Sequence, residues 1–153
     1  MRMPERLPDG TVRGWRTWTV RRFRSGRVYL VSFIGLPREA WPRGVIDARC
    51  LLECDTLMDP ECMCGVYAFH DLATFWQHRV AMPPRDPFRV VGEVCGWGRV
   101  DVHEHGWRAE FAMVRALWTQ DVPPEEVELL GQYYDVPVGS IADLPGGAED
   151  QHS

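Results

Sequence analysis

The sequence contains no lysine, and all 17 of its basic residues are arginine. The absence of lysine excludes a phosphate-binding loop of the Gly-Lys type, which places a lysine ammonium against the phosphates. A Gly-x-Ser-x-Gly nucleophile elbow is also absent, and no cysteine–histidine pair stands out as a nucleophile. The sequence therefore points to no particular reaction.

Long apolar runs are missing as well. None approaches the roughly 18 residues that a membrane helix needs, and the first ten residues have no apolar signal-peptide core. We therefore expect a cytoplasmic protein with no membrane partner. Its 153 residues predict an N-terminal arm over 1–10, a single domain over 11–138 and a flexible acidic tail over 139–153.

Charge is divided unevenly along the chain. Residues 1–49 carry 11 arginines against four acidic side chains, and residues 50–153 carry six against 18, so the halves are about +7 and −12. Contacts between the halves would neutralise both in the folded protein. Alternatively, the basic half contacts nucleic acid through a cluster at Arg21, Arg22, Arg24 and Arg27.

Alternation of β-branched and aromatic residues predicts strands over 11–23 and 27–33, joined by a turn at Ser25-Gly26. A further short strand is expected at Val45-Ile46. Residues 88–111 predict a long antiparallel pair or one strongly bent strand, with alternation continuing through His105.

Two helices are predicted. The first covers 72–78 with Asp71 as its N-cap, and the second starts at Asp121 and runs to Tyr134. The expected fold class is α+β, a mostly antiparallel sheet or partly open barrel with two or three short helices and a zinc knot.

The zinc knot is predicted from the clustering of four of the five cysteines; the fifth, Cys95, is expected to be a buried thiol. A cytosolic setting argues against disulfides, and grouped thiolates are typical tetrahedral ligands of a structural zinc ion. If Cys54 faces away, Asp55 or His70 would complete the site; the alternative is a set of buried, reduced thiols. The predicted ligands are Cys50, Cys54, Cys62 and Cys64.

A stretch rich in tryptophan, arginine and histidine follows later in the chain and predicts a binding surface. Within it, His103, His105 and Glu110 also permit a metal- or histidine-dependent hydrolase, although surface or packed histidines are the simpler interpretation. The candidate binding residues are Trp97, Arg99, His103, His105, Trp107, Arg108 and Glu110.

Three motifs together resemble a family of actinobacterial and phage proteins. They are Trp41-Pro42, the run Pro-Glu-Cys-Met-Cys-Gly-Val-Tyr-Ala over 60–68, and the run from Trp97 to Glu110. The resemblance spans most of residues 13–138 and implies a shared scaffold but no activity. It marks His103, Gly106, Arg108 and Glu110 as motif positions, and many relatives place a histidine where this chain has Cys54-Asp55.

These observations predict a non-enzymatic, zinc-stabilised binding or adaptor protein whose partner is another protein, in keeping with a phage or mobile element. The first alternative is a reader of nucleic acid or modified nucleotides that uses an arginine and tryptophan surface. The second is the hydrolase.

Overall fold

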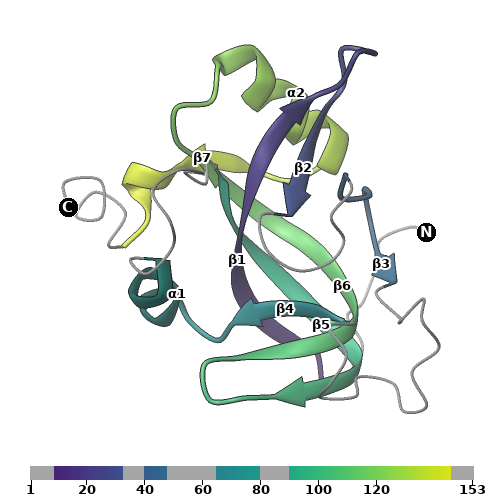
Figure 1. Ribbon diagram of the computed structural model, residues 1–153, viewed down its shortest axis with the longest axis vertical. Coiled ribbons are helices and arrows are strands. Elements are labelled where there is room, and N and C mark those ends of the chain that lie inside the picture. Colours follow the sequence, from purple (N-terminus) through teal and green to yellow (C-terminus); the bar gives the residue numbers. More distant parts are fainter. Residues whose placement is uncertain (1–8, 33–39, 48–64, 80–89, 146–153) are drawn as a thin grey trace.

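The computed structural model describes residues 9–32, 40–47, 65–79 and 90–145, whose strands form one seven-stranded sheet (Figure 1). At this level the predicted α+β fold is confirmed, as a mixed sheet with two α-helices in the described residues and not as a closed barrel. The elements in order are β1 (Val12–Arg22), β2 (Val28–Ser32), β3 (Ile46–Asp47), β4 (Val66–Phe69), α1 (Leu72–Arg79), β5 (Val90–Val102), β6 (Gly106–Thr119), α2 (Pro124–Tyr134), β7 (Val138–Ser140) and the 3-10 helix η1 (Ile141–Asp143).

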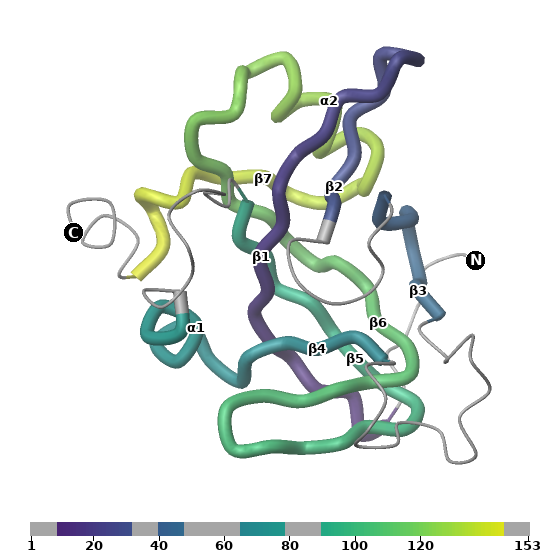
Figure 2. The backbone as a smooth tube through the Cα atoms, viewed as in Figure 1, coloured from purple at the N-terminus to yellow at the C-terminus, as the bar shows by residue number. Residues whose placement is uncertain are grey.

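Three long strands organise the sheet. β5 pairs antiparallel with both β1 and β6, and β1 runs from its pairing with Gly96 of β5 to the hairpin that it forms with β2 (Figure 2). β2 adds to β1, while β3 and β4 add to β6, all antiparallel; β7 joins β6 in parallel. β1 also meets β4, but only at the pair Trp15 and Phe69.

The predicted β1–β2 hairpin is confirmed. Its turn is closed by a 2.8 Å hydrogen bond from the Phe23 amide to the Arg27 carbonyl oxygen and a 2.9 Å bond from the Gly26 amide to the Phe23 carbonyl oxygen. Gly26 has a φ of 86°, which a side chain would disfavour, so the Ser-Gly dipeptide sets the position of the turn.

Of the two alternatives predicted for residues 88–111, the structure has the antiparallel pair, β5 and β6, and the turn between them lies in the later part of that stretch. β5 continues through a bulge at Gly98 to Val102, and the chain reverses over residues 103–105, where the His103 amide donates a 2.7 Å hydrogen bond to the Gly106 carbonyl oxygen. The predicted strand alternation through His105 is wrong at its end, because His103 and His105 belong to the turn.

Both predicted helices form. At α1, the Thr74 amide donates to Asp71 Oδ1 at 2.7 Å, which confirms the N-cap and lowers the pKa of Asp71. At α2 the N-cap is Pro123 and not the predicted Asp121, which precedes it with a φ of 56°. No helix in the described ranges is both long and apolar enough to cross a membrane.

The larger core lies between the sheet and α2. Trp18 packs edge-on against Trp41 with ring centroids 5.1 Å apart, and the Arg16 guanidinium lies 4.8 Å above the Trp41 ring. The Tyr134 hydroxyl accepts a 2.9 Å hydrogen bond from the Leu30 amide and donates one of 2.9 Å to the Trp41 carbonyl oxygen. This buried hydroxyl joins α2 to β2 and to the segment before β3.

The smaller core lies under α1, where the buried side chains of Phe75 and Val91 meet Ile141 and Leu144. Ile141 is 1% exposed and Leu144 is 7% exposed, and both follow β7 in the chain. The predicted start of the flexible tail at 139 is therefore wrong, since residues 139–145 pack on the fold. Residues 146–153, like residues 1–8 of the predicted arm, lie outside the described ranges.

Trp107 occupies a slot between two glycines at the centre of the sheet. A Cβ atom at Gly96 would lie 2.5 Å from Trp107 Cζ3, and one at Gly14 would lie 2.8 Å from Trp107 Nε1. The indole N–H donates a 2.9 Å hydrogen bond to the Arg13 carbonyl oxygen, and the side chain is 1% exposed. One tryptophan thus connects β6 to β5 and β1 through close backbone approach.

The slot can be tested with two glycine-to-alanine substitutions. Gly96→Ala should lower the free energy of unfolding by about 1–3 kcal/mol, because the added methyl group overlaps the Trp107 ring and the Ala109 Cβ. Gly131→Ala is the matched control: its methyl group meets nothing nearer than 3.4 Å and it lies in α2, so stability should rise by up to about 1 kcal/mol. Urea denaturation measures the free energy of unfolding of both variants. An equal change in the two would contradict the close packing of Trp107 against Gly96.

Candidate binding surface

Beyond α1, the sheet face that carries Trp15 and Phe69 continues towards the β5–β6 turn. α1 packs over only the first part of this face. Alternation along β4 buries Val66 and Ala68 on the opposite side and directs Tyr67 to this one. We call the part that no other described element covers the open face; its partly exposed residues are Tyr67, Trp97, Asp101, Arg108, Glu110 and Phe111.

A row of three side chains crosses β4, β6 and β5 on the open face. Arg108 pairs in register with Tyr67 on one side and Asp101 on the other. Its Nη2 lies 3.5 Å from Asp101 Oδ2, and only 12% of the Arg108 side chain is exposed, against 44% for Asp101. Tyr67 is 37% exposed, and partial burial raises its pKa. Arg108 therefore mainly links β6 to β5 through its ion pair with Asp101, and Tyr67 is the accessible side chain beside it.

The other end of the open face is built around the Gly98 bulge. The Arg99 amide donates a 3.3 Å hydrogen bond to Glu110 Oε1, so this carboxylate closes the bulge while the Arg99 side chain stays exposed. Trp97 and Phe111 stack with ring centroids 6.2 Å apart and an interplanar angle of 27°. Their stacking leaves a flat, partly exposed aromatic surface next to the charged row.

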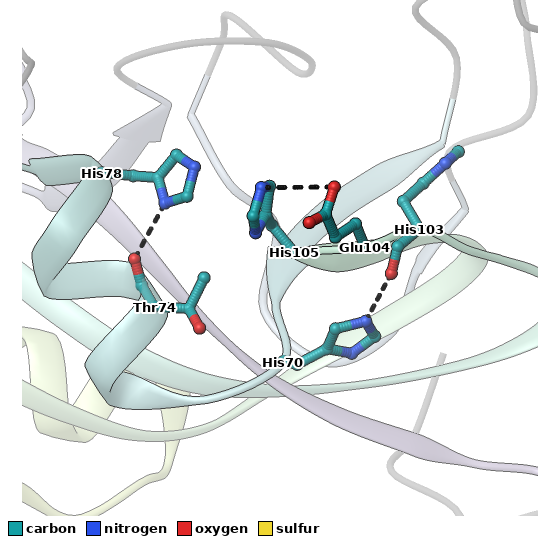
Figure 3. A network of polar contacts seen from close by, with 6 residues as sticks. All are labelled: His70, Thr74, His78, His103, Glu104 and His105. Carbon is teal, nitrogen blue, oxygen red and sulfur yellow. Dashed lines mark hydrogen bonds and ion pairs between the residues drawn. The ribbon is translucent and has the colours of Figure 1, made fainter.

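The structure separates the three residues predicted for a hydrolase. His103 and His105 are exposed in the β5–β6 turn, and the His103 ring points away from His105 (Figure 3). Glu110 lies four residues into β6 from Gly106, about 13 Å along the strand. A carboxylate at that distance is out of hydrogen-bonding reach of either imidazole, so the residues form no acid–base pair.

Trp107 is the one predicted binding residue that the structure moves off the surface. Its indole fills the glycine slot and its only polar atom is bonded to Arg13. The predicted binding role of Trp107 is therefore wrong: the prediction relied on its aromatic character, whereas Gly14 and Gly96, far apart in sequence, bury it.

The predicted zinc ligands Cys50, Cys54, Cys62 and Cys64 lie outside the described residues, as does Asp55. Within the described ranges, no three histidine, cysteine or acidic side chains are arranged to hold a metal. Cys95 is a free thiol, fully buried as expected, and burial raises its pKa, so it is not poised as a nucleophile.

The sequence interpretation missed Tyr67 and Phe111 as surface residues. A signal for Tyr67 existed, because the run Val66 to Phe69 alternates small or aliphatic residues with aromatic ones, which is typical of a half-buried strand. Phe111 had no such signal, since the register shift at the Gly98 bulge decides which way it faces.

No protein-family model matches the chain, and no curated protein or solved structure matches it either. The resemblance to the actinobacterial and phage family stays a prediction.

The structural role of Arg108 can be separated from a binding role by stability measurements. Arg108→Ala should lower the free energy of unfolding by about 1–3 kcal/mol, because it removes a largely buried guanidinium and leaves Asp101 without that partner. Arg99→Ala, an exposed arginine on the same hairpin, should change stability by less than about 0.5 kcal/mol. If Arg108→Ala is as stable as the wild type in thermal denaturation, the Arg108–Asp101 ion pair does not stabilise the pairing of β5 and β6.

Proposed function

We propose that the chain is a non-enzymatic binding protein that engages a protein partner through the open face. The observation that carries the proposal is the partly exposed aromatic set of Tyr67, Trp97 and Phe111 on paired strands beside an internally neutralised Arg108–Asp101 pair. Tyrosine, tryptophan and arginine dominate binding energy at protein interfaces. A surface on strands also needs little ordering when a partner arrives.

Charge supports a protein partner over a nucleic acid at this face. The acidic Asp101 and Glu110 lie beside Arg108, and the chain as a whole carries a formal net charge of −5. Affinity for nucleic acid depends mainly on unneutralised cations against phosphates. The open face presents aromatic area with balanced charge, which suits a protein surface.

The open face is tested by comparing Tyr67→Ala with Phe23→Ala. Both side chains are 37% exposed, but Phe23 lies in the β1–β2 turn at the far end of the molecule (Figure 1). Tyr67→Ala should weaken binding to a partner captured at high salt by about 30-fold, the effect of losing a hot-spot residue. Phe23→Ala should bind like the wild type. Titration calorimetry with the purified partner measures both.

A second candidate function belongs to the β1–β2 turn, where residues 21–27 are all exposed and include four arginines. Phe23, Tyr29 and Tyr133 form a chain of edge-on aromatic contacts with centroids 4.9 and 5.0 Å apart, and Arg43 lies 5.7 Å over Tyr133. Arginines beside aromatic rings suit single-stranded nucleic acid. In that case Phe23→Ala would lose binding to an oligonucleotide in a salt-dependent way and Tyr67→Ala would not.

We also propose that one structural zinc ion is held by Cys50, Cys54, Cys62 and Cys64. Support comes from their spacing and from the described residue that follows them: Gly65 is buried with a φ of 93°, and it leads directly into β4. A zinc site at this position would stabilise the strand that carries Tyr67. His70 or Asp55 stays an alternative fourth ligand.

Cys62→Ser should remove the zinc and lower the free energy of unfolding by at least about 3 kcal/mol, because binding of a structural zinc contributes directly to folding. Cys95→Ala, which alters a buried thiol outside the cluster, should keep the metal content of the wild type. Elemental analysis of freshly purified proteins, followed by urea denaturation, measures both. A Cys62→Ser protein with full metal content would rule out this ligand set.

A further inference from the structure

The four histidines in the described ranges meet at one corner of the molecule. His70 precedes α1 and His78 lies in its last turn, while His103 and His105 lie in the β5–β6 turn (Figure 3). The backbone joins the two segments, because the His70 amide donates a 3.0 Å hydrogen bond to the His105 carbonyl oxygen. Elements separated by β5 in the chain therefore present imidazoles to one another.

Hydrogen bonds to carbonyl oxygens fix which nitrogen of two rings carries the proton. A carbonyl oxygen can only accept, so His78 Nδ1 donates to the Thr74 carbonyl oxygen at 2.9 Å and His70 Nε2 donates to the His103 carbonyl oxygen at 2.7 Å. His70 thereby holds the turn in place. Nε2 of His78 is therefore unprotonated and has a lone pair available. Metal-binding imidazoles are commonly oriented in this way, by a hydrogen bond from the other ring nitrogen to a backbone carbonyl oxygen.

His105 faces His78 across this corner. Their ring centroids lie 4.6 Å apart with an interplanar angle of 58°, and Figure 3 shows the His78 ring directed towards His105. Glu104 lies on the other side, with its Oε2 3.8 Å from His105 Nε2. The Glu104 side chain is 87% exposed, so it can rotate without disturbing the core. Two imidazoles and a carboxylate form a ligand set suited to zinc and similar divalent ions.

We propose that His78 and His105 bind a divalent transition-metal ion of the zinc type, with water completing the shell. In the described part of the chain the three side chains are not yet arranged as a metal site, so Glu104 must rotate in to become the third ligand. The ligands of this site are other residues than the four cysteines, and the site does not depend on the proposed function. Because its two imidazoles come from different elements, the ion cross-links α1 to the β5–β6 turn. The bound ion would fix the edge of the open face next to Tyr67.

The test uses the full chain, first saturated with zinc and dialysed so that cysteine ligands are already occupied. Further zinc is then titrated while long-range ¹H–¹⁵N spectra follow each imidazole nitrogen. The expected result is one additional bound ion that shifts the nitrogens of His78 and His105. His78→Gln and His105→Gln should each weaken this binding at least about tenfold. Glu104→Gln should weaken it less.

His103→Gln is the matched control, since His103 lies in the same turn with its ring directed away from the pair. It should bind the additional ion like the wild type. The ion should also raise the thermal midpoint of the wild type and of His103→Gln but not of His78→Gln. The proposal is overturned if no imidazole nitrogen of His78 or His105 shifts, or if His103→Gln weakens binding as much as His78→Gln.

Discussion

The fold depends on the close packing of one tryptophan against two glycine-bearing strands. The Trp107 indole can pack against β1 and β5 only because Gly14 and Gly96 carry no side chain there. This contact brings three strands together at one point, and strand alternation then decides which neighbours face outward. Arg108 faces the open face because Trp107 faces the core. The surface proposed for binding is therefore a direct result of how the core is filled.

Local sequence signals predicted the elements that depend on local chemistry. The Ser25-Gly26 turn and the Asp71 cap could be predicted because the responsible groups lie within a few residues of each other. The packing of Ile141 could not, since small and acidic neighbours conceal an apolar residue that contacts a distant helix. The position of the β5–β6 turn was missed because alternation looks the same in a strand and in a short turn that follows it.

The sequence predicted the residue types of the candidate site but not their burial or their tertiary contacts. The aromatic and charged character of the β5–β6 region was visible in the sequence, but the burial of Trp107 and the meeting of His78 with His105 depend on strand pairing and on the docking of α1. The zinc ligands were inferred from spacing alone. The sequence shows which residue types are present, and the structure shows which of them are in contact. Those contacts show that Arg108 links two strands, whereas Tyr67 is accessible at the surface.

The contact between β1 and β4 is narrow: they pair at Trp15 and Phe69 alone, whereas β4 and β6 pair at four positions. β4 can therefore part from β1 while β5 and β6 stay together, at a smaller free-energy cost than complete unfolding. Arg16 crosses this seam, with its Nη1 donating a 2.9 Å hydrogen bond to the Tyr67 carbonyl oxygen. Together with the Trp15–Phe69 pair, this buried guanidinium holds the seam closed, and the frequency of opening sets the rate of hydrogen exchange at those β4 amides that face β1.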